Sequence, residues 1–334
     1  MVFDAAKRPR VAFISQPEYF RFMYENDLAD FADVVEFKLQ ISKSAEHYAD
    51  LISYQAEYNF FFRGEYIPDR VLTQLTGHKI ALSSEPFPRI VDGKREYTRD
   101  SLNRYLFFRS IRNKAFDYLF HYDAASLPFM DWDGLEVSGE FAFPVATSVF
   151  KPQPCQPSWD IFFIGRSTTH REHYFGLLKH HYNFLHICHG IWGPSLVDYL
   201  CAAKVCLNVH AENETSWEPR MQMMLACGVF VVSERITPNS YLRPGIDFIE
   251  VDGALAMYQA VEHYLYDDEA RAKISRSGYE RVHQILDSSK CFRELIEGIH
   301  ANRFRRFSTR PGASALNGLL GAQRAWTSLK SKLR

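Results

Sequence analysis

Residues 205–234 read VCLNVHAENETSWEPRMQMMLACGVFVVSE and contain one complete strand–helix–strand unit. The apolar runs at 205–210 and 229–233 are nearly continuous and rich in β-branched residues, as expected of strands that are buried on both faces. Between them, a polar loop leads to a helix predicted over 220–227. Gly228 follows that helix, and glycine is favoured just after a helix C-terminus. The unit therefore predicts parallel strands joined by a helical crossover.

The same alternation extends over the rest of the chain. Its further strands are predicted at 10–14, 33–37, 58–62, 79–83, 118–121, 160–165, 183–188 and 247–251. Its further helices are predicted at 44–53, 100–113, 173–180, 195–203, 256–265 and 268–282. Repeated strand–helix alternation favours mostly parallel sheets covered by helices. We therefore predict an α/β protein with two Rossmann-like domains that face a central cleft.

A proline-rich segment separates the two halves. Residues 144–158 read PVATSVFKPQPCQPS, with four prolines that disfavour helix and sheet pairing. We predict a first domain over 1–150, a second over 151–300, and a basic tail over 301–334. A stripe of Phe292, Leu295 and Ile299 is expected to return to the first domain, because residues at this spacing share one helix face.

Composition narrows the class of protein. Hydrophobic residues make up 46% and charged residues 24%, which is ordinary for a globular protein. Lys and Arg number 39 against 40 Asp and Glu, so no nucleic-acid partner is expected. Six cysteines without a CxxC pair favour a reducing, cytoplasmic setting. The basic tail is a candidate for peripheral contact with an anionic membrane surface, such as the inner membrane, or else a solvated or packed end of the chain.

A phosphate-binding loop is predicted after the strand at 160–165. It reads Gly165-Arg166-Ser167-Thr168-Thr169-His170-Arg171 and stands just before a helix. Glycine lets a ligand approach the backbone, arginine matches phosphate geometry, and a helix N-terminus adds N–H donors. These features suit a diphosphate. The alternative is that Arg166 and Arg171 are ordinary surface arginines at the start of a helix.

Sugar-binding side chains are predicted in the loop that opens the 220–227 helix. Carboxylates, amides and hydroxyls of this kind bind hydroxyl-rich ligands. The residues expected to face a sugar are Asn208, His210, Ser216 and Glu218. Arg220 follows them at the start of the helix. The alternative is an ordinary helix start with Pro219 at its first turn.

These residues resemble a known family. The segment EPRMQMMLACGVFVVSE is similar to the signature helix of glycosyltransferases with two Rossmann-like domains, the GT-B fold. It most resembles the family 1 branch that includes the CgeB-like proteins, and it is also similar to the retaining family 4 enzymes. The resemblance spans about residues 159–295. It implies that Arg166 and Arg171 contact a donor diphosphate, that Arg220 neutralises leaving-group charge, and that the first domain holds the acceptor.

The chain departs from the family pattern at one position. The family has a ribose-binding glutamate five residues before the final glycine of the signature, and this chain has Met223 there. The resemblance therefore leaves the ribose contact open, with Glu234 as a substitute. Altered donor preference and loss of activity are both compatible with Met223.

Acceptor-side catalytic residues are sought where the first-domain strands end. Glu85 follows the strand at 79–83, and His121 ends the strand at 118–121. A carboxylate or histidine there could activate an acceptor hydroxyl. No cluster has metal-ligand spacing, and GK[ST] and GxGxxG motifs are absent, which argues against metal sites, ATPases and NAD enzymes.

The sequence as a whole predicts a metal-independent glycosyltransferase without a cofactor. It would move a sugar, with retention, from a nucleotide-sugar donor to a glycan, lipid-linked glycan or protein. Three alternatives remain open at this point, one of which is a nucleic-acid role through the basic tail. The second is a sugar-nucleotide epimerase of similar fold, and the third is a non-catalytic sugar-nucleotide-binding or scaffold protein.

Overall fold

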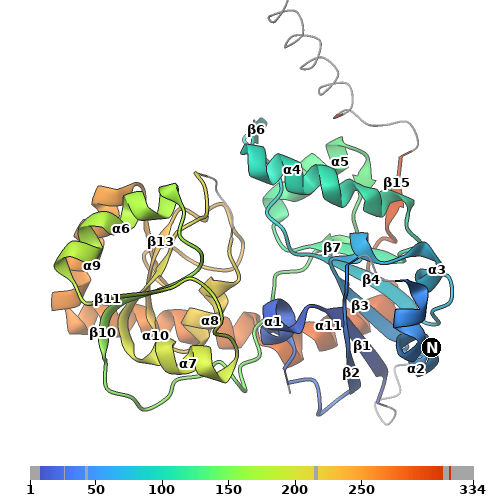
Figure 1. Ribbon diagram of the computed structural model, residues 1–334, viewed down its shortest axis with the longest axis horizontal. Helices are drawn as coiled ribbons and strands as arrows, with labels where there is room; N and C mark the ends of the chain where they lie inside the picture. The colour runs from blue at the N-terminus through green and yellow to red at the C-terminus, as the bar shows by residue number, and fades with distance from the viewer. Residues whose placement is uncertain (1–7, 26, 42–43, 214–216, 311–315, 317–334) are drawn as a thin grey trace, which may run out of the picture.

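The structure is a computed structural model that describes residues 8–25, 27–41, 44–213, 217–310 and 316. It contains two parallel sheets, each flanked by helices (Figure 1). The α/β class with two Rossmann-like domains, predicted from the strand–helix alternation, is confirmed.

The first sheet has six parallel strands in the order β2-β1-β3-β4-β7-β9. They are β1 (Arg10–Ser15), β2 (Asp33–Lys38), β3 (Tyr58–Phe62), β4 (His78–Ser83), β7 (Tyr118–His121) and β9 (Gly139–Glu140). Every residue of β3 and β7 is buried, which explains their unbroken apolar and aromatic sequences. Asn59 is the polar exception in β3, and its amide donates to the Thr76 carbonyl at 3.0 Å.

The first-domain helices are α1 (Pro17–Phe20), α2 (Ala49–Tyr54), α3 (Asp69–Leu72), α4 (Arg99–Phe108) and α5 (Leu127–Trp132). The predicted helix at 44–53 is wrong at its start, because Ala45–Tyr48 form a 3₁₀ turn. The predicted helix at 100–113 ends at Phe108 and continues as a 3₁₀ turn. A hairpin of β5 (Arg89–Val91) and β6 (Lys94–Glu96) precedes α4 and was not predicted.

The second sheet has five parallel strands in the order β11-β10-β12-β13-β14. They are β10 (Trp159–Ile164), β11 (Phe184–Ile187), β12 (Ala203–Asn208), β13 (Phe230–Glu234) and β14 (Ile249–Val251). Its helices are α6 (Thr169–His181), α7 (Pro194–Cys201), α8 (Arg220–Ala226), α9 (Ala254–Tyr266) and α10 (Asp268–Ile285). All ten predicted strands thus have a counterpart in the two sheets, with ends that shift by a few residues.

The last long helix, α11 (Ser288–His300), lies against the first sheet although it follows the second domain in sequence (Figure 1). Phe292, Leu295 and Ile299 are all buried. Phe292 contacts the rings of Phe13 and Phe60, at centroid distances of 5.1 and 5.3 Å. The predicted apolar stripe of this helix therefore packs against amino-terminal residues.

Two segments cross between the domains side by side. Val145, in the proline-rich segment 144–158, donates its N–H to the Leu286 carbonyl at 2.8 Å. Ser288 donates its N–H back to Val145 at 3.1 Å. The Thr147 hydroxyl adds a bond of 2.5 Å to the Asp287 carboxylate. The outgoing and returning passages of the chain are thus joined by backbone and side-chain hydrogen bonds.

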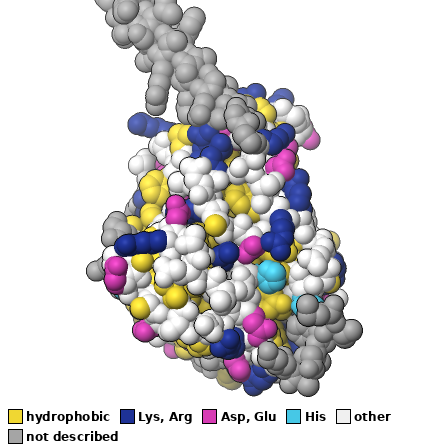
Figure 2. All heavy atoms as spheres, turned by 90° about the vertical axis from the view of Figure 1, so that its right-hand side faces the viewer, with side chains coloured by type: hydrophobic (Ala, Val, Ile, Leu, Met, Phe, Trp, Pro, Cys, Tyr) yellow, Lys and Arg dark blue, Asp and Glu magenta, His cyan; other side chains and the backbone are white. Residues whose placement is uncertain are grey.

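The described start of the basic tail is held by the first domain. Strand β15 (Ser308–Thr309) pairs antiparallel with β8 (Leu135–Glu136). Arg306 forms an ion pair with Asp117 at 2.9 Å, and Arg310 forms one with Asp131 at 3.0 Å. On the face of the first domain in Figure 2, basic and acidic side chains are interspersed. The remaining basic positions, Arg324, Lys330, Lys332 and Arg334, lie outside the described residues, so membrane contact stays a prediction.

The structure also describes all six cysteines, and each is a free thiol. Among the described residues, no helix combines the length and the apolar character that a membrane crossing needs.

Candidate functional site

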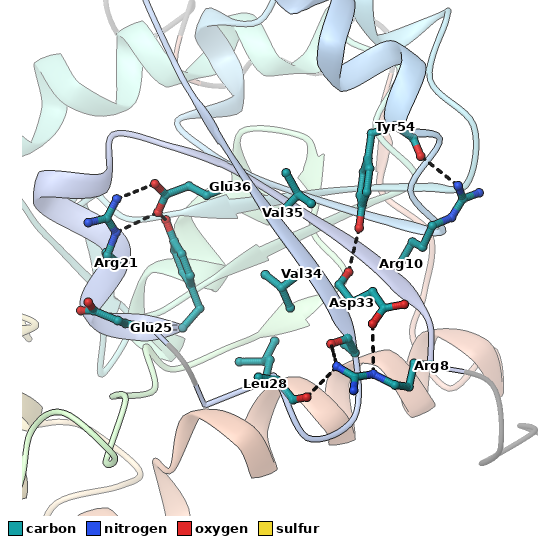
Figure 3. A pocket seen from close by; sticks show the side chains of 13 residues that line it. Arg8, Arg10, Arg21, Glu25, Leu28, Asp33, Val34, Val35, Glu36 and Tyr54 are labelled. Carbon is teal, nitrogen blue, oxygen red and sulfur yellow. Dashed lines mark hydrogen bonds and ion pairs between the residues drawn. The ribbon is translucent and has the colours of Figure 1, made fainter.

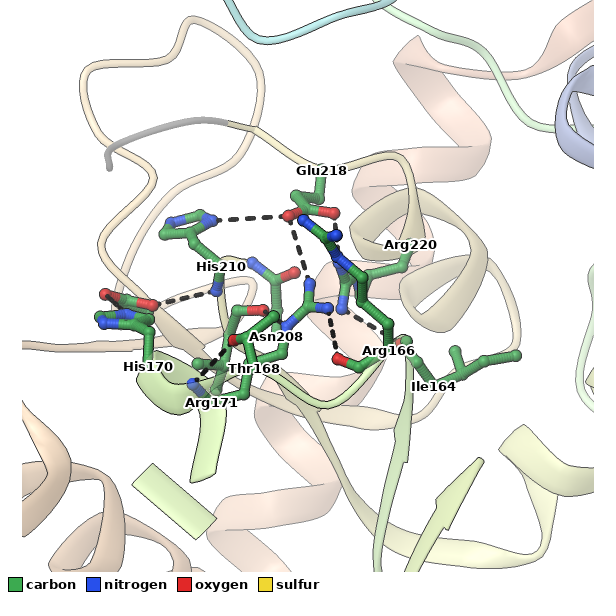
Figure 4. Close-up of polar contacts among 12 residues, drawn as sticks. Ile164, Arg166, Thr168, His170, Arg171, Asn208, His210, Glu218 and Arg220 are labelled. Atoms are coloured by element: carbon green, nitrogen blue, oxygen red, sulfur yellow. Dashed lines mark hydrogen bonds and ion pairs between the residues drawn. The ribbon is translucent and has the colours of Figure 1, made fainter. Parts of the chain in front are cut away.

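The strand order of the second sheet creates a natural binding position. Strand β10 pairs with β11 on one side and with β12 on the other, so the chain winds in opposite directions from this point. In such sheets, ligands bind beyond the carboxyl ends of the strands where the winding reverses. The loops that follow β10 and β12 meet here, and Figure 4 shows their polar residues close together.

Gly165 forms the floor of this cluster, directly after β10. Its φ of +146° is one that other residues rarely adopt. A Cβ at this position would lie 3.1 Å from Nη1 of Arg171 and 3.2 Å from Nη1 of Arg220. The glycine therefore allows two guanidinium groups to approach the backbone at the end of β10.

The two guanidinium groups share one aromatic ring. Arg171 lies 5.0 Å and Arg220 5.1 Å from the centroid of Phe163, the typical range of a cation–π contact. Arg220 donates to the Ile164 carbonyl at 3.1 Å. Arg171 donates to the carbonyls of Val209 and Arg166, both at 2.9 Å. Two positive charges are thus fixed together at one edge of the sheet.

Glu218 neutralises part of this charge. Its carboxylate is hydrogen-bonded to Arg220 and lies 3.6 Å from Arg171. Although burial alone would raise the pKa of Glu218, the neighbouring Arg220 and His210 hold it well below its usual range. Burial, followed by the repulsion of Arg220, lowers the pKa of Arg171 to about 10. Glu218 was predicted to face a sugar, whereas here it orients the two arginines.

His210 and Glu234 form a second part of the cluster. Glu234 accepts from the His210 backbone N–H at 3.0 Å and from the Tyr174 hydroxyl at 3.2 Å, and it pairs with His170 at 2.8 Å. Both oxygens of its carboxylate are therefore used by the protein. The idea that Glu234 replaces the family's ribose-binding glutamate gains no support from this geometry, because a ribose would have to displace these donors.

His210 is fully buried next to this carboxylate. Its Nε2 lies 2.9 Å from the Arg235 carbonyl, and its Nδ1 lies 3.9 Å from Glu218. Burial acts to lower the pKa of His210, but Glu218 and Glu234 outweigh it and raise the pKa above its usual value. The predicted sugar-facing histidine is therefore enclosed beneath the cluster.

The other residues predicted on the donor side are either exposed, buried, or outside the described residues. Arg166 and Ser167 are exposed at the start of α6, and Ser167 donates to Glu172 at 2.6 Å. Asn208 is buried and donates to Ser233 at 2.9 Å, and its Oδ1 has no partner among the described residues. Ser216 lies outside the described residues. Arg166 is thus the arginine of this loop whose guanidinium is open to a ligand.

Met223 is half-buried on α8 and packs against the core that the two domains share. Its neighbour Met224 is 2% exposed. The position that corresponds to the family's ribose-binding glutamate is therefore at the margin of the core rather than inside it.

The two residues predicted on the acceptor side, His121 and Glu85, are both held by contacts within the first domain. His121 is 0% exposed, stacks on Phe87 and lies 3.0 Å from Ser83 Oγ. Burial lowers its pKa to about 4. His121 was expected at the cleft, but Phe87 covers it. Glu85 is partly exposed and forms ion pairs with Arg63 at 2.8 Å and with Arg104.

Another large cavity, of about 820 Å³, lies beside edge strand β2 (Figure 3). Its arginines are all engaged by the protein. Arg8 pairs with Asp33 at 3.1 Å, Arg21 pairs with Glu36 at 2.6 Å, and Arg10 donates to the Tyr54 carbonyl at 3.1 Å. This cavity therefore offers less to an anionic ligand than the cluster after β10.

Sequence reasoning missed two sets of residues. His170 and Tyr174 on α6 complete the Glu234 contacts, and nothing in their spacing points to a carboxylate on another strand. The hairpin β5–β6 brings Arg89 and Arg95 toward the second domain. A sequence signal for it does exist, since Asp92-Gly93 between two short runs is a typical hairpin turn.

A protein-family model described as glycosyl transferase-like matches residues 167–297. A search of curated protein sequences finds no match. Three solved structures of similar fold each cover 88% of this chain over 100% of their own length. They are sucrose-phosphate synthase from Thermosynechococcus elongatus (12% identity, TM-score 0.59), an alpha-glucosyltransferase bound to UDP-glucose and DNA (12%, 0.57), and Anabaena HepE bound to UDP and glucose (10%, 0.56).

The matched family region contains most of the residues labelled in Figure 4, from Thr168 to Arg220. The similar structures extend the agreement in fold over both domains. The assignment to the CgeB-like branch stays a prediction. Residues 167–297 match the glycosyl transferase-like family model, and the chain has the two-domain GT-B fold of the solved structures to which it is similar.

Proposed function

We propose that this protein transfers a sugar from a nucleoside-diphosphate sugar to an acceptor hydroxyl, with retention of configuration at the anomeric carbon. The observation that supports it best is the convergence of Arg171 and Arg220 on Gly165 at the carboxyl end of β10. The positive charge of this pair, the open backbone at Gly165 and the exposed Arg166 together suit a diphosphate. Similar folds have been solved with UDP or UDP-glucose bound, which favours a donor of this class.

The donor diphosphate would lie on the Gly165–Arg166 backbone at the start of α6. Thr168 caps this helix by accepting the N–H of Arg171 at 3.2 Å, and the first turn offers further N–H groups. Arg166 is exposed and can close over the phosphates. Arg171 is nearly enclosed, so its main role is to position Glu218 and the Arg166 carbonyl.

In the reaction, the bond between the anomeric carbon and the phosphate oxygen breaks, and a bond to the acceptor oxygen forms. The acceptor hydroxyl loses its proton, and the diphosphate leaves with the bonding electron pair. Arg220 stabilises the charge that develops on the leaving diphosphate. Glu218 holds Arg220 in place through their ion pair. Closure of the domains would exclude water and so limit hydrolysis of the donor.

The proposal is tested by calorimetry with uridine, guanosine and adenosine diphosphates. One of them should bind the wild-type protein, and R166A and R220A should weaken that binding by about 1.5–3 kcal/mol each. R276A is the matched control, since Arg276 is exposed on α10 away from the cluster. Unchanged affinity in both site variants would refute the placement of the donor.

Product analysis then separates the possible activities. Incubation with the matching sugar nucleotide and a panel of glycans, lipid-linked glycans and peptides should give a glycoside with the donor's anomeric configuration. An epimerised sugar nucleotide without acceptor would indicate the epimerase. Binding without any product would indicate a sugar-nucleotide-binding protein, the alternative that Met223 suggests.

A further inference from the structure

A polar cavity of about 350 Å³ lies between the two domains, next to the cluster after β10, since the carbonyl of its lining residue Arg235 contacts His210. Eight of its ten lining residues come from the first domain, at the β5–β6 hairpin and the start of α4. The other two, Asn213 and Arg235, follow β12 and β13 of the second domain. The cavity is therefore built mainly by the domain opposite the predicted donor site.

Arg89 is the buried cation of this cavity. It is 2% exposed, and it donates to Asp123 at 2.7 and 3.0 Å and to the Pro238 carbonyl of the second domain at 3.1 Å. Its Nη1 is buried and has no hydrogen-bond partner among the described residues. An unpaired charged donor in a buried position is costly, and because Arg89 lines the cavity, its positive charge favours an anion there.

Two more arginines line the cavity, and few carboxylates lie close enough to balance their positive charge. Arg95 is exposed, stacks on Trp132 at 4.4 Å and pairs with no carboxylate among the described residues. Arg235 approaches Glu96 only to 4.0 Å, and both side chains remain largely open to solvent. With Asp123 and Glu96 counted against the three arginines, the cavity keeps an excess of positive charge.

The start of α4 adds to this preference. Thr98 caps the ten-residue helix and Ser101 is its third residue, and both line the cavity. A helix N-terminus favours negative charge. Tyr97 also lines the cavity and is 44% exposed, so it offers an aromatic face of the kind on which a sugar ring can stack.

We propose that this cavity binds an anionic group, phosphate or carboxylate, on the sugar acceptor. The inference rests on the proposed glycosyl transfer, and it names the class of acceptor that this transfer would use. Arg95 from the first domain and Arg235 from the second would both contact the anion. Binding of the acceptor would thereby draw the two domains together over the donor.

The test uses the full chain and three probes that share one hexose ring, which are glucose 6-phosphate, glucuronate and glucose. Binding is measured by NMR and calorimetry in the wild-type protein, R95A and R235A. K94A is the control, because Lys94 is exposed on the same strand but does not line the cavity. We expect both anions to bind at millimolar concentration or below, and glucose to bind at least about tenfold more weakly. R95A and R235A should each lose about tenfold in affinity for the anions, and K94A should lose none.

Three results would overturn the proposal. The first is a failure of the cavity to prefer anions. Either glucose and glucose 6-phosphate bind equally, or neither glucose 6-phosphate nor glucuronate binds at millimolar concentration. The second is unchanged anion affinity in R95A and R235A. The third is an equal loss of nucleoside-diphosphate affinity in R95A, which would assign the cavity to the donor.

Failure of the proposed function gives a different pattern. If no nucleoside diphosphate binds while the anions bind through Arg95 and Arg235, the anion site is supported. Sugar transfer, and with it the acceptor role of the site, is then refuted.

Discussion

Phe292 lies edge-on to Phe13, with ring centroids 5.1 Å apart, and both side chains are fully buried. Phe13 belongs to β1, whereas Phe292 belongs to α11, the last long helix of the described residues. The core of the first domain is therefore completed by a helix that the chain supplies only after it has built the second domain.

Replacing Phe292 with alanine should therefore destabilise the first domain. A cavity left by a fully buried phenylalanine costs about 3–5 kcal/mol. Urea unfolding followed by hydrogen exchange in β1 and β3 measures the effect. The control is L255A, because Leu255 is 64% exposed on α9. An equal, small loss in both variants would mean that α11 contributes little to this core.

Met223→Glu should strengthen binding of a nucleoside diphosphate, because it restores the carboxylate that the family uses for ribose. Met223 is half-buried, so the added charge can stay in contact with water and the fold should survive. Met224→Glu is the matched control, since Met224 is 2% exposed and a carboxylate there would be costly. If M223E shows a large fall in melting temperature and no gain in affinity, Met223 serves core packing rather than nucleotide binding.

Glu218→Gln should lower stability at neutral pH by about 1–3 kcal/mol, because it removes the charge that holds Arg171 and Arg220 together. The folded pKa of Glu218 lies below its unfolded value. Its contribution is therefore present above the unfolded pKa and is lost as the pH falls through the folded pKa. Urea midpoints of the two proteins should converge as the pH is lowered. Parallel curves over the whole acid range would contradict the ion pair.

His121 should make the protein sensitive to mild acid. Burial lowers its folded pKa to about 4, below the ordinary value of 6.5. The unfolded chain then binds more protons than the folded one, so stability is complete above about pH 6.5 and falls by up to about 3 kcal/mol toward pH 4. His121→Asn can keep the bond to Ser83 but cannot titrate, so its unfolding free energy should fall less over this range.

The control for this prediction is His189→Asn, because His189 is exposed. That variant should follow the wild-type pH curve. If H121N follows it as well, the enclosed position of His121 is not what makes the fold sensitive to acid.

The strands could be predicted because their signal is local. Tyr58–Phe62 and Tyr118–His121 are buried on both faces, so their sequences are continuously apolar or aromatic and the predicted bounds agree with β3 and β7. Strands β8 and β15 have two residues each and exist only because the chain returns to pair them. No local pattern could reveal that contact.

The candidate site was predictable in its parts but not in its arrangement. The loop from Gly165 to Arg171 could be predicted to bind phosphate from its glycine, its two arginines and its position before a helix. That Arg171 folds beneath the loop, held by the carbonyls of Arg166 and Val209, depends on a strand far away in sequence. His121 was placed correctly at the end of β7, yet its burial depends on Phe87, which follows a different strand.

The paired crossings at Val145 and Leu286–Ser288 determine how the two domains can move. A single connecting strand would let one domain swivel and twist freely relative to the other. Here the two passages are hydrogen-bonded to each other and behave as a narrow ribbon. A ribbon bends readily across its flat face, but it resists torsion and lateral shear. The domains should therefore open and close by rotation about a single hinge axis. Arg235 would then return to the same place beside the β5–β6 hairpin at each closure.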